Sequence, residues 1–336
     1  MEYAATLRLL IGGGDLSDAQ AYALFGEIMD GAISPVRAAG LLTALAAKGE
    51  TIDEVVGAAR AMRERSLHVE HGLDCVVDVV GTGGDGADTI NISTMAALVV
   101  AATGLAVAKH GNRAASSACG SADVLEAEGL PLDIAPEVAA AMLRATNFTF
   151  MFAPRYHPAM KNVAPVRREL GVRTIFNVLG PLTNPARATH QIVGVARESQ
   201  LELMGDVLRG LGVEAGAVVH GEDGIDEIGG DAPTVVYSFA RDQVKRWRLD
   251  PHEYGIYAPL ETIRGGTVDR CREAFARILS GELSPAADVV ALNAGFVLHA
   301  CGTARSIDEG LAIARDVLAS GRALEVFERA KEASHG

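Results

Sequence analysis

The sequence has few cysteines and no hydrophobic run long enough to cross a membrane. Its four cysteines (Cys75, Cys119, Cys271 and Cys301) show no C-x-x-C spacing, which argues against a zinc site and a disulfide framework. The longest apolar stretches, such as 95–102, are too short to span a bilayer. No basic start with an apolar run follows Met1, as a signal peptide requires. We therefore expect a cytoplasmic protein with no membrane partner.

The chain also has no excess of basic residues. Its 336 residues carry 30 Lys and Arg against 43 Asp and Glu, a formal net charge of −13. Nucleic acids bind proteins through a net basic face, so a nucleic-acid partner is not expected. The hydrophobic fraction of 49% is ample for a large core. A chain of this length suggests about two domains.

Residues 1 to about 70 are predicted to form helices only. Ser17-Asp18-Ala19-Gln20 has the pattern of a capping box, Ser34-Pro35 opens a second helix, and Thr51 caps a third. A bundle of this size buries little apolar surface by itself. We therefore expect it to pack against the rest of the chain or against a second subunit.

From Cys75 onward, strands and helices alternate. A strand is predicted at 75–80, a helix at 93–103 and a second strand at 105–108, with a glycine-rich loop between the first strand and the helix. Strand–loop–helix units of this kind predict a parallel sheet. Later strands are expected at 192–195, 217–220 and 234–239, and helices from about 269 to the end. The fold class is therefore α/β, with a small helical domain before it.

Two loops that follow predicted strands have the composition of anion sites. The first is Gly81-Thr82-Gly83-Gly84-Asp85. The second runs from Lys109 to Asp123, and no acidic residue occurs between Asp88 and Asp123. Glycine lets backbone N–H groups approach an anion, and a lysine or arginine adds charge. Because loops after neighbouring parallel strands open at the same edge of a sheet, both should line one crevice. Either loop alone is equally compatible with an ordinary turn.

Two further segments are candidate sites with an alternative interpretation each, and a third is interpreted as structural. The window 138–168 contains five cations and no acid, and Arg167 could grip a carboxylate in bidentate fashion or lie on a solvated basic face. Asp226-Glu227 follow a predicted strand and suit Mg²⁺, although a solvated acidic turn has the same composition. The segment 177–185 is predicted to be a rigid structural loop.

Taken together, these segments resemble the anthranilate phosphoribosyltransferases. The motifs that match, in order, are Gly81–Asp85, Asn91–Thr94, Lys109–Asp123, Pro165–Thr174, Asn177–Pro185 and Asp223–Glu227. The resemblance implies a small helical domain, residues 1–70 joined by helices from about 163–182, and an α/β catalytic domain, residues 71–336. This fold is shared with pyrimidine nucleoside phosphorylases. It also implies a homodimer formed through the helical domains.

The same resemblance implies the ligands and the residues that hold them. The substrates would be phosphoribosyl pyrophosphate (PRPP) and anthranilate, with two Mg²⁺ ions per active site. Mg²⁺ would be held by Ser93, Asp226 and Glu227, and anthranilate by Gly81, Asn112 and Arg167. The PRPP site would consist of Gly81, Gly84, Asp85, Thr89, Asn91, Ile92, Ser93, Thr94, Lys109, His110, Gly111, Asn112, Arg113, Ala114, Ala115, Ser116, Ser117 and Ser121.

The expected reaction transfers the phosphoribosyl group of PRPP to the amine of anthranilate and releases pyrophosphate, a step of tryptophan biosynthesis. Two other functions stay open at this point. A pyrimidine nucleoside phosphorylase would share the fold and a phosphate loop. A non-catalytic, nucleic-acid-binding relative would require a net basic surface, which the composition does not favour.

Overall fold

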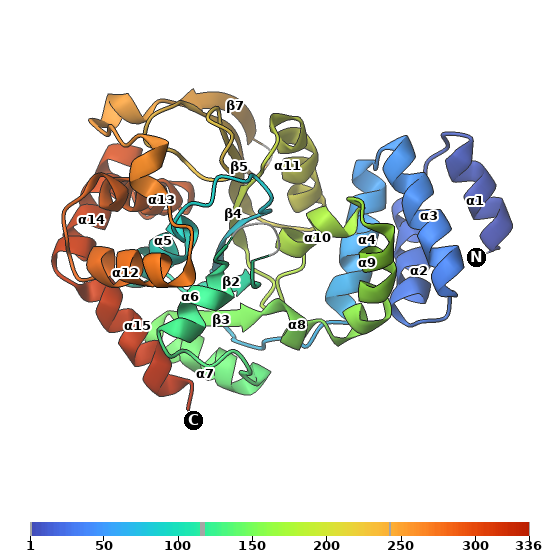
Figure 1. Cartoon of the computed structure of the whole chain (residues 1–336), viewed down its shortest axis with the longest axis horizontal. Coiled ribbons are helices and arrows are strands. Elements are labelled where there is room, and N and C mark those ends of the chain that lie inside the picture. The colour runs from blue at the N-terminus through green and yellow to red at the C-terminus, as the bar shows by residue number, and fades with distance from the viewer. Residues whose placement is uncertain (1, 115–117, 242, 336) are drawn as a thin grey trace.

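The computed structural model describes residues 2–114, 118–241 and 243–335. Figure 1 shows a helical part at the N-terminal end beside a larger α/β part. Two of the predicted caps form: the Ser17 hydroxyl accepts a hydrogen bond from the Gln20 amide, and Thr51 does the same for Glu54. Ser34 also precedes a helix that starts at Pro35, but its side chain makes no cap hydrogen bond. The helical part begins with α1 (Tyr3–Ile11), α2 (Asp18–Met29), α3 (Pro35–Lys48) and α4 (Ile52–Glu64).

The α/β part is built on a seven-stranded sheet with the order β3-β2-β1-β4-β5-β6-β7. The first five of these strands run parallel, and β6 and β7 pair antiparallel at one edge. The mostly parallel sheet expected from the sequence is therefore confirmed. The strands are β1 (Val77–Gly81), β2 (Val107–Gly111), β3 (Phe148–Phe152), β4 (His190–Gly194), β5 (Ala215–Gly221), β6 (Thr234–Ala240) and β7 (Gln243–Leu249).

Two of these strands are not among those predicted. The apolar β3 lies within residues 138–168, the window that was of interest for its cations. Strand β7 lies at the edge of the sheet, and its side chains are largely exposed and partly basic. A second prediction is wrong at β2, because Lys109 and His110 belong to the strand and not to the loop after it. The loop begins only after Gly111, so the strand geometry fixes where both side chains point.

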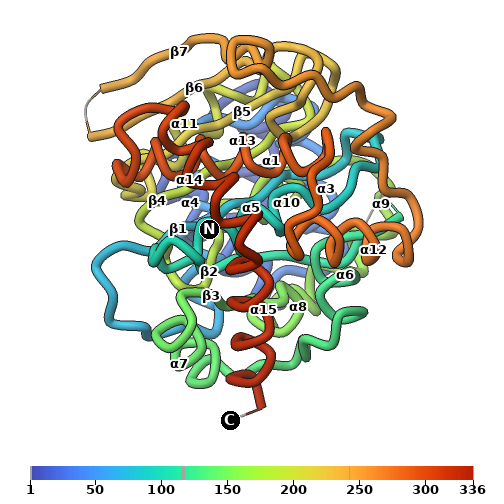
Figure 2. The backbone as a smooth tube through the Cα atoms, turned by 90° about the vertical axis from the view of Figure 1, so that its left-hand side faces the viewer, coloured from blue at the N-terminus to red at the C-terminus, as the bar shows by residue number. Residues whose placement is uncertain are grey.

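Helices cover both faces of the sheet (Figure 2). The prediction of a rigid loop at 177–185 is wrong over residues 177–182, because Phe176–Leu182 forms a helix that contains Pro181. No helix in the described part of the chain has the length and apolar character that crossing a bilayer requires. The remaining helices are α5 (Ile92–Ala101), α6 (Ser121–Ala127), α7 (Pro136–Thr146), α8 (Ala153–Tyr156), α9 (Ala164–Leu170), α10 (Phe176–Leu182), α11 (Leu201–Gly210), α12 (Val268–Leu279), α13 (Pro285–Ala300), α14 (Ile307–Ala319) and α15 (Arg322–Ala333), with short 3₁₀ turns at Pro158–Asn162, Glu198–Gln200, Pro251–Tyr254 and Leu260–Ile263.

The two faces of the sheet belong to two separate hydrophobic cores. One face packs with α5, α13, α14 and α15. On the other face, Val193 and Val218 pack with α11 and share a continuous core with Leu45 of α3 and Val55 of α4. The helical bundle therefore buries its apolar side against the rest of the chain, as expected for so small a bundle. This packing fixes the bundle next to the carboxyl ends of the parallel strands.

Close packing of α2 on α4 depends on Gly57. A Cβ at this position would lie 2.3 Å from the Asp18 carbonyl oxygen, so Gly57→Ala forces two backbones apart. We expect it to lower the free energy of unfolding by about 1–3 kcal/mol, measured by chemical denaturation. Gly40→Ala is the matched control in α3, where the nearest neighbour is the end of the Tyr3 side chain. Equal stability of the two variants would contradict this account of the bundle.

Candidate active site

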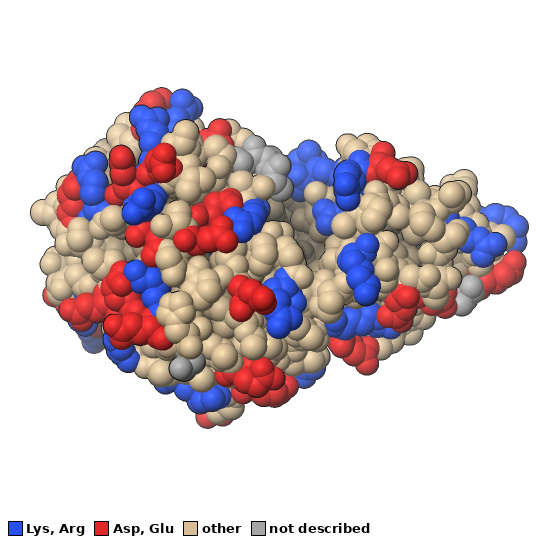
Figure 3. Space-filling model, turned by 60° about the horizontal axis from the view of Figure 1, so that its bottom comes forward, with Lys and Arg blue, Asp and Glu red and all other residues tan. Residues whose placement is uncertain are grey.

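A cavity of about 980 Å³ lies between the helical part and the carboxyl ends of the parallel strands. Figure 3 shows the surface hollowed between the two parts, with Lys and Arg side chains on the smaller one. The loops after β1 and β2, predicted to share a crevice, both line this cavity. That prediction is confirmed, because the two strands are neighbours in the sheet.

Most residues predicted for the PRPP site line the cavity. The exception among the described residues is Ile92, the first residue of α5. Its side chain is buried in the hydrophobic core, and its backbone N–H donates a hydrogen bond to the Ile90 carbonyl. Ala115, Ser116 and Ser117 lie outside the described residues. The lining residues from that prediction are Gly81, Gly84, Asp85, Thr89, Asn91, Ser93, Thr94, Lys109, His110, Gly111, Asn112, Arg113, Ala114 and Ser121, and Arg167, Asp226 and Glu227 join them.

The glycine loop after β1 is shaped by its contact with Asp226. The Gly83 amide donates a 2.6 Å hydrogen bond to Asp226 Oδ2, and both Gly83 and Gly84 have positive φ angles, 66° and 81°. A Cβ on Gly81 would lie 2.4 Å from the same carboxylate oxygen. Glycine is therefore required at 81 by close approach and at 83 and 84 by backbone conformation.

Lys109 is the cation at the floor of the cavity. Its side chain is only 2% exposed, and Nζ donates hydrogen bonds to the Val79 carbonyl, at 2.5 Å, and to Ser93 Oγ, at 3.3 Å. Burial lowers its pKa, and the nearby carboxylates of Asp78 and Glu227 oppose that shift. An ammonium held in this way supplies positive charge directly beneath the glycine loop.

The acidic pair lies across the cavity floor from Lys109. The Ser93 amide at the start of α5 donates to Glu227 Oε1 at 3.2 Å, and the Asp226 amide donates to Asp85 Oδ2 at 3.3 Å. Asp226 is only 8% exposed, so the alternative of a solvated acidic turn does not hold for this residue. Its burial results from the contacts with Gly81 and Gly83 described above.

The pKa values of this pair are raised. Burial, followed by the charge of Asp85, raises the pKa of Asp226 to about 7. Burial, followed by the charge of Asp226, raises the pKa of Glu227 to about 8. Neighbouring carboxylates repel one another when both ionise, and a bound cation removes that repulsion.

These side chains fit Mg²⁺, which takes one or two carboxylates together with water and substrate phosphate oxygens. Ser93, Asp226 and Glu227 offer only oxygen atoms. Within the described ranges, no group of three or more His, Cys, Asp or Glu side chains is arranged to hold a metal ion. The donor set is therefore one that needs further oxygen atoms to complete it, as a substrate phosphate would supply.

Beneath the floor lies a buried polar network around Asp78. Its carboxylate accepts hydrogen bonds from the His110 amide (3.3 Å), Asn184 Nδ2 (2.8 Å) and Gln191 Nε2 (3.3 Å). Burial raises the pKa of Asp78 to about 6, against the effect of Lys109. The network holds the middle of β1, the end of β2 and the segment after α10 in fixed positions. Sequence reasoning did not include Asp78, although it interrupts an apolar run.

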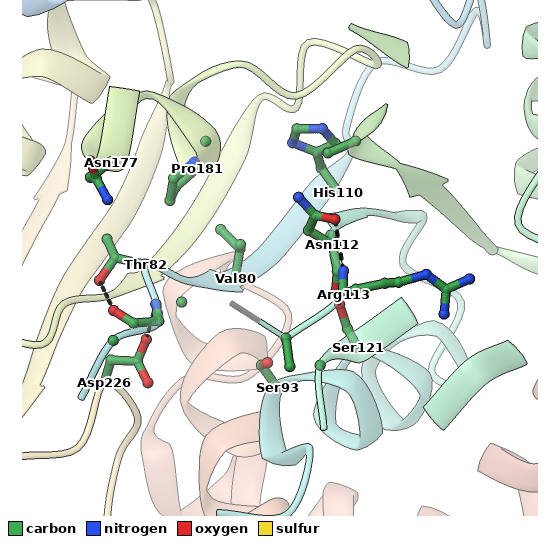
Figure 4. Close-up of a pocket in the computed structure, with 18 of the residues that line it drawn as sticks. Val80, Thr82, Ser93, His110, Asn112, Arg113, Ser121, Asn177, Pro181 and Asp226 are labelled. Carbon is green, nitrogen blue, oxygen red and sulfur yellow. Dashed lines mark hydrogen bonds between the residues drawn. The ribbon is translucent and has the colours of Figure 1, made fainter. Parts of the chain in front are cut away.

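The loop after β2 points different side chains in different directions (Figure 4). Asn112 and Ser121 lie at the cavity, whereas the Arg113 guanidinium extends away from it and pairs with Asp123 and Glu126, at 3.0 and 2.7 Å. Arg113 lines the cavity, but its charge is engaged by these two carboxylates. The structure therefore gives Arg113 a role in holding the loop against α6.

The opposite wall comes from the helical part and carries the remaining cations. Lys161, Arg167 and Arg173 line the cavity, and the Arg167 guanidinium lies 5.7 Å from the centre of the Phe176 ring. The other arginines of the acid-free window do not line it: Arg155 pairs with Asp133, and Arg168 is exposed. The cavity thus has the carboxylates and Lys109 on one side and Lys161, Arg167 and Arg173 on the other.

The cavity is also lined by residues that the sequence did not single out as site residues, among them His157 and Asn177. His157 Nε2 lies 3.2 Å from Nε2 of His110, and burial lowers the pKa values of both, that of His157 to about 4. The pair is therefore neutral near pH 7. His157 could have been selected because it lies in the acid-free window 138–168. Asn177 was not selected because the segment 177–185 was interpreted as a structural loop.

Comparison with known proteins gives the family. Residues 5–66 match the helical bundle domain, and residues 73–324 the a/b domain, of a glycosyl transferase family. An anthranilate phosphoribosyltransferase of Symbiobacterium thermophilum is 49% identical over 332 residues, covering 98% of this chain and 97% of its own.

Solved structures agree. The anthranilate phosphoribosyltransferase of Thermus thermophilus has a TM-score of 0.93 at 46% identity, covering 98% of this chain and 99% of its own. The Saccharomyces cerevisiae enzyme in complex with PRPP and Mg has a TM-score of 0.91 at 25% identity, covering 99% and 98%. With both domains matched and near-complete coverage in each comparison, the chain belongs to the anthranilate phosphoribosyltransferase family of glycosyl transferases.

Proposed function

We propose that the chain transfers the phosphoribosyl group of PRPP to the amine of anthranilate, with Mg²⁺ as cofactor, in tryptophan biosynthesis. The observation that carries this proposal is the joint lining of one cavity by the glycine loop, Lys109, the acidic pair and Arg167. Membership of the family supports the choice of both substrates.

The two substrates are assigned to opposite walls. The α/β domain, proposed as residues 71–336, offers the glycine loop and the loop after β2 to PRPP. The helical domain, proposed as residues 1–70 with 163–182, offers Arg167 to the anthranilate carboxylate, with Gly81 and Asn112 across the cavity. The division matches the chemistry, since a planar guanidinium is suited to a carboxylate and backbone amides to phosphates.

Charge stabilisation at the leaving group is the main task of the PRPP wall. The dipole at the start of α5 and the charge of Lys109 favour negative charge on the departing pyrophosphate. Ser93, Asp226 and Glu227 would hold Mg²⁺, which would neutralise charge on the leaving group. We propose two ions per site, the number that the family resemblance implies.

The helical wall serves to position the nucleophile. Cleavage of the C1–O bond leaves oxocarbenium character on the ribose, as at other glycosidic carbons. The aromatic amine is neutral at pH 7, so its lone pair is available without a strong base. Arg167, through the anthranilate carboxylate, and Asn112 position anthranilate so that its amine lies on the face of the ribose opposite to the leaving group. Attack from that face gives inversion at C1. Positioning and electrostatics together account for the rate.

Loss of anthranilate fluorescence in the presence of PRPP and Mg²⁺, with mass-spectrometric identification of the product, tests the reaction. We expect phosphoribosylanthranilate and one equivalent of pyrophosphate. A parallel incubation with pyrimidine nucleoside and phosphate should give no phosphorolysis. Turnover of the nucleoside without turnover of anthranilate would overturn the proposal in favour of a phosphorylase.

Binding of PRPP with Mg²⁺ should strengthen as the pH rises from 6 to 8. The raised pKa values of Asp226, about 7, and Glu227, about 8, mean that both carboxyls are largely protonated at pH 6. A protonated carboxyl must release its proton before it binds a cation. Calorimetric titration at several pH values measures the effect.

Asp226→Asn should flatten this pH profile and reduce turnover by on the order of 10². Glu222→Gln is the matched control, since Glu222 lies in the same turn but pairs with Arg248. An unchanged pH profile in Asp226→Asn would show that the acidic pair does not hold the cation.

Arg167 and Arg168 form a natural pair of variants. Arg167 is half-buried and lines the cavity, whereas its neighbour Arg168 is exposed. Arg167→Ala should raise the KM for anthranilate by roughly ten- to a hundredfold, the loss of one charge-assisted contact, and leave the KM for PRPP nearly unchanged. Arg168→Ala should behave like the wild type. A KM effect on PRPP alone would contradict the assignment of this wall.

A homodimer through the helical domain is also proposed. Ile11 of α1 and Val36 of α3 are 71% and 82% exposed, unusual for apolar side chains on so small a bundle. Sedimentation should show a dimer at micromolar concentration that Ile11→Glu with Val36→Glu dissociates. Leu283→Glu, at an equally exposed apolar position of the α/β part, should leave it intact. A wild-type monomer would refute the proposal.

A further inference from the structure

Two cations of the helical wall, Lys161 and Arg173, line the cavity and have exposed side chains. In the part of the chain that the structure describes, neither side chain forms an ion pair, a hydrogen bond or a contact with an aromatic ring. Arg155 of the same acid-free window differs, because it pairs with Asp133. The charges of Lys161 and Arg173 are therefore available to act on a ligand.

The backbone beneath both side chains is held in place. Lys161 lies in a 3₁₀ turn, and the next residue, Asn162, donates a hydrogen bond of 2.7 Å from Nδ2 to the Met29 carbonyl of α2. Gly171 ends α9 in a left-handed conformation, with a φ of 61°, and turns the chain so that Arg173 lies at the cavity. The fold therefore keeps both charges on the helical wall.

The cavity differs in charge from the chain as a whole. Among the described residues that line it, five are Lys or Arg and four are Asp or Glu, whereas the whole chain has 30 against 43. Lys and Arg side chains of the smaller part lie beside the hollow in Figure 3. A hollow between protein walls focuses such charge and raises the local concentration of anions. The four carboxylates all belong to the opposite, α/β part: Asp85, Asp88, Asp226 and Glu227.

We propose that Lys161 and Arg173 draw the anionic substrates into the cavity by long-range attraction and do not touch them once they are bound, a role that rests on the proposed function. PRPP carries phosphates and anthranilate carries a carboxylate, so both substrates are attracted. The attraction is proportional to the charge of the ligand, so PRPP is drawn more strongly. Attraction of this kind raises the rate of association and leaves the chemical step unchanged.

Arg167, on the same wall, is built for a different task. It is half-buried, and its guanidinium lies 5.7 Å from the centre of the Phe176 ring, so the planar group has a fixed orientation for a direct contact. Lys161 and Arg173 are exposed, and a direct contact would cost the rotamer freedom of their long side chains. Their charge acts at a distance without that cost.

Steady-state kinetics of the full chain with Mg²⁺ test the proposal at about 10 mM and about 1 M salt, between which the screening length falls from about 30 Å to about 3 Å. Lys161→Gln with Arg173→Gln should lower kcat/KM for PRPP about three- to tenfold at low salt, lower it less for anthranilate, and leave kcat unchanged. At high salt the variant and the wild type should agree within about twofold, because the attraction is then screened.

Two controls separate attraction from contact. Lys161→Arg with Arg173→Lys keeps both charges and should retain wild-type kinetics at both salt concentrations, whereas a bidentate contact would not survive the loss of the planar guanidinium. Arg168→Gln removes an exposed charge that lies in the same segment and does not line the cavity. It should change kcat/KM by less than about twofold at low salt.

A loss of kcat/KM that is equal at both salt concentrations, a fall in kcat, or a loss in the charge-keeping variant would overturn the proposal, because each marks a direct contact or a structural role. A loss confined to anthranilate would overturn it as well, since it would mark contact with that carboxylate. Failure of the wild type to form phosphoribosylanthranilate would instead overturn the proposed function.

Discussion

Burial of the Lys109 ammonium among carboxylates is the interaction on which the cavity floor depends. Its hydrogen bonds to the Val79 carbonyl and Ser93 hydroxyl join β2 to β1 and to the start of α5. Removing such a charge from water is costly unless carboxylates lie close by, and Asp78 and Glu227 meet that requirement. The same cation lowers the pKa values of Asp78 and Glu227, against the effect of burial. The anion site and the cation site are therefore parts of one electrostatic arrangement.

The position of the helical bundle completes the site. Because the bundle shares a core with one face of the sheet, α9 and α10 are held opposite the glycine loop. Substrate recognition is in this way divided between a wall built for phosphates and a wall built for a carboxylate. Arg167, packed over Phe176, keeps a fixed orientation on the second wall before a ligand arrives.

Features that depend on local sequence could be predicted. The caps at Ser17 and Thr51 form because a hydroxyl and a residue three positions later suffice. The glycine loop and the acidic pair could be placed at one sheet edge, because parallel strands impose that geometry. Features that depend on distant neighbours could not. The burial of Asp226 follows from its contact with Gly81, and the engagement of Arg113 follows from its ion pairs with α6.

Titration of PRPP with Mg²⁺ into the wild type and Lys109→Met, at pH 7 and pH 9, tests this account most directly. Methionine matches the length of lysine and leaves the carboxylates without their cation, so their pKa values should rise further. The account predicts binding at least about tenfold weaker at pH 7, the loss of one charged contact, with partial recovery at pH 9 as the acidic pair ionises. Wild-type affinity in Lys109→Met at pH 7 would contradict it.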